Sequence, residues 1–128
     1  MRSLLIPYTY PTMAIDDPLA INRKEGKSPD ILIFQLTGPV TLRNLFGLQD
    51  QLRSGDLPRA AILDLSSVPY MDSAGMGAIV NYYVFCQNRG VRLVVAGVSS
   101  RVMELFKMTR VDSVLAFAPT ADTAEASL

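Results

Sequence analysis

The chain has 128 residues, 49% of them hydrophobic, and its 12 basic side chains balance 12 acidic ones. This length and apolar content suit a single packed domain and exclude a disordered chain. Because contacts to nucleic-acid phosphates require a local basic surplus, the zero net charge and the lack of a long basic block also exclude a nucleic-acid-binding protein.

The residue types that commonly carry catalysis are scarce. The chain contains no histidine, which excludes Ser-His-Asp and Cys-His catalysis as well as histidine-based metal sites. We therefore expect a protein that is not an enzyme and that uses no cofactor and no metal. The remaining enzyme hypothesis is a catalytic pair of Ser73 and a lysine. The chain has three lysines, and none stands at a sequence spacing from Ser73 that indicates such a pair: Lys24, Lys27 and Lys107.

We expect the N-terminal segment to carry no export or membrane signal. Residues 1–13 contain Pro7 and Pro11 and too short an apolar run for a secretory signal, and no stretch reaches the roughly 20 apolar residues of a membrane span. We predict an extended arm over 1–13 that need not be ordered, and one domain over 14–128. The expected location is cytoplasmic, with no direct membrane insertion. The single cysteine, Cys86, lies in an apolar helical run and is expected to be buried and structural.

The first predicted elements form an antiparallel hairpin. A short strand over 19–23 and an apolar strand over 31–36 flank a turn segment that contains Gly26 and Pro29. A loop over 37–40 follows the second strand.

A helix is predicted next, over 42–54. Thr41 suits its N-cap position, and the segment contains apolar residues at helical spacing: Leu42, Leu45, Phe46 and Leu52. Gly55 and Pro58 then end the helical pattern.

The second half of the chain alternates strands with helices. Residues 60–65 form a nearly continuous apolar run, which is typical of a strand buried on both faces. A helix over 73–89 follows, with Gly90 as its left-handed C-terminal cap. The last predicted elements are a strand over 91–95, a helix over 100–108, a strand over 114–117 and a short helix after residue 119. This order predicts an α/β fold with a mixed sheet of about four to five strands.

The strongest functional signal lies between the strand over 60–65 and the helix that follows. The segment reads Leu63-Asp-Leu-Ser-Ser-Val-Pro-Tyr-Met-Asp-Ser-Ala-Gly-Met-Gly77, at the sheet edge where α/β proteins usually dock ligands and partners. Asp72 and Ser73 stand at the helix start, where side-chain oxygens accept hydrogen bonds from free backbone N–H groups.

Two glycines follow the Asp-Ser pair at once. Gly75 and Gly77 each cost the helix about 1 kcal/mol relative to alanine. They indicate either tight packing of the helix on the sheet or close approach of another surface or a phosphoryl group. Their spacing matches neither a P-loop nor a dinucleotide fingerprint, so we expect no nucleotide cradle.

This segment resembles the signature of STAS domains, especially that of the bacterial anti-sigma factor antagonists, in which an Asp-Ser-x-Gly-Leu/Met-Gly turn opens the second helix. Three further segments resemble the family in the same order: Leu36-Thr-Gly38, Gly90 to Gly97 and Ser99 to Thr109. The resemblance covers residues 18–118 and implies a single STAS-type domain.

The resemblance also implies a phospho-switchable binding module. Ser73 matches the serine that partner kinases phosphorylate in that family, and Asp72 matches the acidic residue beside it. The implied partners are an anti-sigma factor that is also an ATP-binding serine kinase, which phosphorylation of Ser73 would release, and a phosphatase that acts on Ser73. The expected partner-binding residues are Thr41, Asp72, Ser73, Ala74, Gly75 and Met76.

One position departs from the family pattern. The loop after the second strand reads Gly-x-Leu-Asp in the antagonists and Gly38-Pro-Val-Thr41 here, so Thr41 replaces the expected aspartate. We interpret Thr41 as a helix cap, and the alternative is a polar contact with a partner. The departure favours a second hypothesis, in which the chain is a STAS subunit of a lipid- or anion-transport complex and acts as a cytoplasmic interaction or regulatory domain.

Overall fold

The computed structural model describes residues 17–45 and 47–128, and the predicted arm over 1–13 lies outside them. The described chain forms a five-stranded sheet in which the strands follow their sequence order. The first strand pairs antiparallel with the second, and the other pairs are parallel. The predicted mixed α/β sheet with an N-terminal hairpin is therefore confirmed. Its strands are β1 (Ala20–Glu25), β2 (Ile31–Thr37), β3 (Ala60–Ser67), β4 (Arg92–Ala96) and β5 (Ala116–Ala118).

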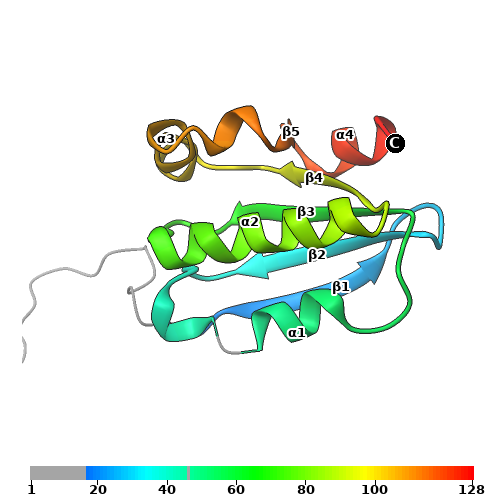
Figure 1. Cartoon of the computed structure of the whole chain (residues 1–128), viewed down its shortest axis with the longest axis horizontal. Coiled ribbons are helices and arrows are strands. Elements are labelled where there is room, and N and C mark those ends of the chain that lie inside the picture. Colours follow the sequence, from blue (N-terminus) through cyan, green and yellow to red (C-terminus); the bar gives the residue numbers. More distant parts are fainter. Residues whose placement is uncertain (1–16, 46) are drawn as a thin grey trace, which may run out of the picture.

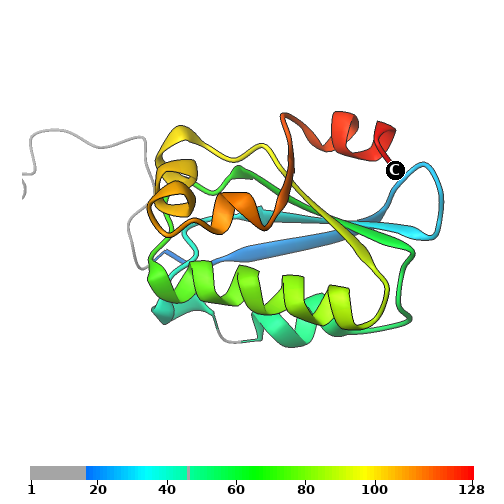
Figure 2. The same cartoon turned by 45° about the horizontal axis from the view of Figure 1, so that its top comes forward.

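Helices cover both faces of this sheet. The α-helices are α1 (Leu48–Arg53), α2 (Ser73–Asn88), α3 (Ser100–Met108) and α4 (Ala121–Ala126), and the 3-10 helices are η1 (Leu42–Asn44) and η2 (Val111–Ser113). Figures 1 and 2 show α1 and α2 lying alongside each other, with α4 near the C-terminus. None of the described helices combines the length and the apolar character that crossing a bilayer requires.

The core has two parts, one on each face of the sheet. Apolar side chains of α1, α2 and α3 pack on the larger side, together with Leu63 and Leu65 of β3. Ala124 of α4 packs on the other side against Ile62 of the same strand. β3 is therefore buried on both faces from Ala60 to Leu65, as its continuous apolar sequence predicts.

Two predicted elements differ from the structure. The helix predicted over 42–54 is wrong as one element, because η1 ends at Asn44 and α1 begins only after Gly47. Gly47 has φ +78°, a left-handed backbone that cannot continue a right-handed helix. Because η2 extends the turn before β5, the strand predicted over 114–117 begins two residues late, at Ala116.

The predictions for the end of α2 are confirmed. Gly90 has φ +71° directly after the helix, as a left-handed C-terminal cap requires. Cys86 is 1% exposed and belongs to the larger core, where burial raises the pKa of its thiol.

Cys86 should consequently resist thiol reagents in the folded protein. A raised thiol pKa leaves little thiolate near neutral pH, and burial requires local opening before a reagent can enter. We expect labelling by a chromogenic disulfide reagent at pH 8 to be at least about 100-fold slower than in the chain unfolded by guanidinium. Equal rates for the folded and unfolded chains would contradict the burial of Cys86.

Candidate phosphorylation and docking site

The loops that follow β2 and β3 run side by side beyond the end of the sheet. The Val40 N–H donates to the Tyr70 carbonyl at 3.0 Å, and the Asp72 N–H donates to the Val40 carbonyl at 3.2 Å. An isolated parallel bridge between Val40 and Met71 continues the pairing of the two strands. The start of α2 is thus attached to the loop after β2 through backbone hydrogen bonds.

The carboxylate of Asp72 connects α2 to η1. Its Oδ1 accepts the Gly75 N–H at 2.8 Å, which makes Asp72 the N-cap of α2. Its Oδ2 accepts the Leu42 N–H of η1 at 3.1 Å. The predicted capping role is confirmed, and the second bond extends it to another element.

Ser73 is the first residue of α2, and its side chain is exposed. Across residues 17–45 and 47–128 the Ser73 hydroxyl makes no hydrogen bond, because Asp72 performs the capping. Ala74 follows and is half-buried. The loop therefore presents a hydroxyl group to solvent at a position fixed by its neighbours.

The two glycines of the signature, Gly75 and Gly77, have different surroundings. A Cβ on Gly75 would lie 2.0 Å from the Val40 carbonyl oxygen, so this residue must be glycine for α2 to approach the loop after β2. Gly75 is buried in that contact, so of the two alternatives we assign it to packing, and not to the partner contact that the resemblance implied. A Cβ on Gly77 would meet no atom within 4 Å, so Gly77 leaves an open, exposed surface.

The structure contradicts the expectation that Thr41 contacts a partner. It is 2% exposed and stands at the N-cap position of η1, where its N–H donates to Asn44 Oδ1 at 2.7 Å. The helix that it precedes is η1 alone, because the predicted longer helix is interrupted. Burial assigns Thr41 to the packing of the loop and removes it from the accessible surface.

Met76 is oriented toward α3. Its sulfur lies 3.1 Å from the hydroxyl of Thr109, the residue that caps the end of α3. Met76 is half-buried in this position, so any contact that it makes with a partner would include the end of α3.

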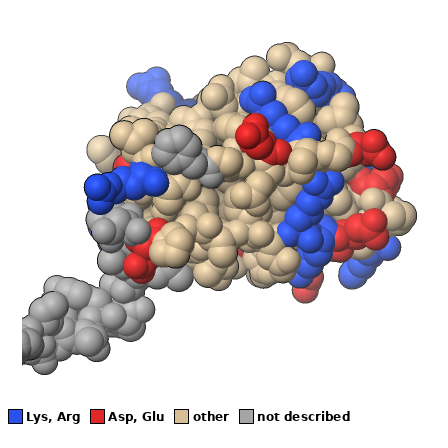
Figure 3. Space-filling view, turned by 90° about the horizontal axis from the view of Figure 1, so that it is seen from below, with Lys and Arg blue, Asp and Glu red and all other residues tan. Residues whose placement is uncertain are grey.

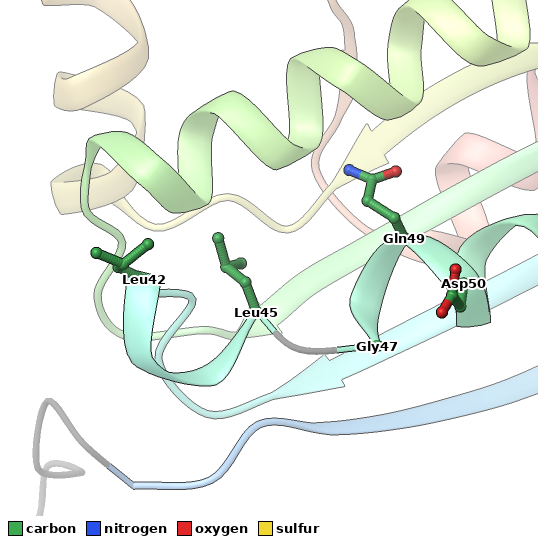
Figure 4. A pocket seen from close by; sticks show the side chains of 5 residues that line it. All are labelled: Leu42, Leu45, Gly47, Gln49 and Asp50. Carbon is green, nitrogen blue, oxygen red and sulfur yellow. The ribbon is translucent and has the colours of Figure 1, made fainter.

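An apolar hollow that the sequence did not predict lies beside η1. It has a volume of about 270 Å³ and is lined by Leu42, Leu45, Gly47, Gln49 and Asp50 (Figure 4). Leu42 is 69% exposed, although its spacing suggested a core residue. Because the Leu42 N–H binds the Asp72 carboxylate, the hollow adjoins the Ser73 loop. No pattern in the sequence indicated this hollow, because the helical spacing over 42–54 hides the break that the left-handed backbone of Gly47 makes before α1.

Among the residues that the structure describes, no side chain forms a hydrogen bond with the Ser73 hydroxyl. In the part of the chain that the structure describes, no lysine nitrogen hydrogen-bonds to Ser73, and no group of three or more Cys, Asp or Glu side chains could hold a metal ion. This arrangement suits a group that another protein modifies or contacts.

A model of the STAS domain family matches residues 25–124, which covers the sheet from the last residue of β1 onward. The chain belongs to the STAS domain family. The anti-sigma-B factor antagonist of Listeria monocytogenes is 36% identical to this STAS domain over 99 residues, which are 76% of this chain and 86% of the relative.

Two solved structures also resemble this STAS domain. The structure of an anti-sigma factor antagonist from Mycobacterium paratuberculosis has a TM-score of 0.77 at 18% identity, over 90% of this chain and 97% of the other. A sulfate transporter family protein from Wolinella succinogenes has a TM-score of 0.65 at 27% identity, over 77% of this chain and 84% of the other.

Gly75 and Gly77 of this STAS domain provide a matched pair of variants. Gly75→Ala should lower the free energy of unfolding by about 2 kcal/mol or more, because its Cβ would collide with a backbone oxygen. Gly77→Ala should be neutral or raise it by up to about 1 kcal/mol, because alanine favours the helix and the space is open. Urea denaturation of both variants tests the assignment. Similar stabilities would show that α2 does not need the close approach to Val40.

Proposed function

We propose that this STAS domain is an anti-sigma factor antagonist that binds an ATP-binding serine kinase, itself the anti-sigma factor, and is released when Ser73 is phosphorylated. In this function the chain is not an enzyme. The partner kinase supplies nucleotide and metal, the chain supplies the hydroxyl, and a phosphatase restores it.

The observation that carries the proposal is the accessibility of the Ser73 hydroxyl. Its hydroxyl is exposed and carries no structural hydrogen bond in the described chain, while Asp72 beside it holds the helix start in place. Kinase and phosphatase can therefore reach the group without unfolding the loop. The 36% identity to a protein named anti-sigma-B factor antagonist supports the same role.

Electrostatics support a switch at this position. A phosphate on Ser73 adds about 1.5 to 2 negative charges beside the Asp72 carboxylate. The first turn of a helix tolerates an anion because of its free N–H groups and its dipole, so the fold should survive. A partner surface that packs on the loop would instead meet concentrated negative charge.

The apolar hollow beside η1 supports a docking surface next to the switch. The exposed Leu42 side chain offers apolar area that a partner can bury, and its backbone is bonded to the same carboxylate that caps α2. A charge added at Ser73 would have to lose water at the margin of this apolar contact, which is costly. We therefore infer that the partner covers Leu42 and Ser73 together.

A second candidate function is a regulatory subunit of a transport complex. The 27% identity to a sulfate transporter family protein favours it, as does Thr41 in place of the family's aspartate. Affinity purification from the native host distinguishes the two functions, since the first predicts recovery of an ATP-binding kinase and the second recovery of a membrane permease.

Ser73 should be the phosphate acceptor. Incubation with the cognate kinase and ATP should give one phosphate per chain, measured by intact-protein mass spectrometry, and none in Ser73→Ala. Ser67→Ala is the matched control, because Ser67 is an exposed serine at the end of β3, just before the same loop, and this variant should be modified like the original protein. Phosphate that persists in Ser73→Ala would refute the assignment.

Phosphorylation should weaken the complex with the partner kinase by at least about a hundredfold, since like charges in an interface cost several kcal/mol. Ser73→Asp should weaken it less, because aspartate carries one charge on a shorter side chain. Isothermal titration of the unmodified, Ser73→Asp and phosphorylated proteins measures the series. Tighter binding after phosphorylation would indicate that arginines of the partner bind the phosphate, and it would overturn the release model. Equal affinities would leave Ser73 without a switching role.

A further inference from the structure

Three arginines gather on the face of the molecule that carries α1 and α2. Arg23 comes from β1, Arg53 ends α1, and Arg89 follows the last residue of α2. Figure 3 shows a band of basic side chains on this face. The three residues, called here the arginine cluster, lie at the end of α2 opposite to Ser73, so they are separate from the site described above.

Aromatic side chains hold the cluster in place. The Arg53 and Arg89 guanidinium carbons lie 4.6 Å and 4.0 Å from the centre of the same ring, that of Phe85. This ring stacks on Tyr82 at 5.9 Å, and Tyr82 meets Phe34 edge-on at 6.1 Å. The row of rings thus joins the two arginines of the helices to the sheet beneath them.

Arg23 completes the cluster from the sheet. Its guanidinium carbon lies 5.8 Å from the centre of the Phe34 ring. The same group donates at 2.8 Å to both the carbonyl oxygen and the hydroxyl of Ser54. Arg23 is therefore anchored, and it adds a fixed positive charge at Ser54, the residue that follows Arg53.

The N–H edges of Arg53 and Arg89 are available for a ligand. An aromatic ring covers the face of a guanidinium group and leaves its in-plane donors exposed. Within residues 17–45 and 47–128, neither side chain donates a hydrogen bond or forms an ion pair. Because both groups contact one ring, their central carbons lie no farther apart than the sum of the two ring distances. Two such cations repel each other, and an anion between them would relieve the repulsion.

We propose that the arginine cluster is a docking surface for an acidic segment of a partner protein. Paired guanidinium groups bind carboxylates through two parallel N–H···O bonds each, and stacking on Phe85 orients them before binding. The surface is independent of the Ser73 switch, so it functions whether or not Ser73 is phosphorylated.

The surroundings of Arg23 favour a peptide over a membrane or a nucleic acid. Arg23 also lines a polar hollow of about 260 Å³ that contains Glu25, Asp30 and Asp56. A broad anionic surface laid across the cluster would meet these carboxylates as well. A narrow acidic segment can follow the arginines and avoid them.

A labelled deca-glutamate peptide tests the proposal by fluorescence anisotropy with the full chain at low salt. We expect binding that weakens with added salt and falls by about tenfold or more in the double variant R53Q/R89Q. The control R101Q/K107Q removes the same charge from exposed positions on α3, including an arginine that stacks over Tyr70 at 5.0 Å, and should lose less than about twofold. R53K/R89K keeps both charges without the planar fork and should bind with intermediate affinity.

Circular dichroism and urea denaturation confirm that each variant is folded before binding is compared. No binding of deca-glutamate to the original chain would overturn the proposal, as would equal losses in R53Q/R89Q and R101Q/K107Q. Vesicles of phosphatidylserine and phosphatidylcholine form the second arm of the experiment. Binding to these vesicles in place of the peptide, lost in R53Q/R89Q, would identify a lipid surface and overturn the peptide assignment.

Discussion

The carboxylate of Asp72 is the group on which the geometry of the Ser73 loop depends. It accepts one N–H from α2 and one from η1, and so fixes two elements that come from different parts of the chain. Capping bonds of this kind contribute about 1 kcal/mol each to stability. Because the Asp72 carboxylate accepts the N–H that a helix cap must bind, the Ser73 hydroxyl is not needed as a cap. The fold can therefore tolerate a change in the chemical state of Ser73.

The same loop shows how apolar and charged surfaces can be combined in one docking site. Leu42 supplies apolar area that is favourable to cover, and Ser73 supplies a position at which charge can be added or removed. With Thr41 buried in place of an aspartate, Asp72 carries the negative charge of the loop before modification. A phosphate adds about 1.5 to 2 negative charges, which is more than the single charge of Asp72. One phosphorylation would therefore more than double the negative charge of the loop.

Much of this arrangement could be predicted from the sequence, because its determinants are local. Asp72 and Gly90 occupy capping positions whose chemistry depends on neighbouring backbone, and the apolar run of β3 follows from burial on both faces. The exposed position of Leu42 could not be predicted, because the helical spacing of its segment gave no sign of the left-handed backbone at Gly47. The arginine cluster was also missed, since it forms only when β1, α1 and α2 come together.

The length of α2 has a consequence for how a partner would be held. Over its 16 residues the helix is about 24 Å long, at 1.5 Å per residue, and it separates Ser73 from Arg89. This distance is about three times the screening length at physiological salt, so charge added at one end is hardly felt at the other. A partner bound at both ends would lose one contact on phosphorylation and remain tethered by the second, at a high effective concentration. Such a complex would re-form quickly after dephosphorylation, without a new diffusional search.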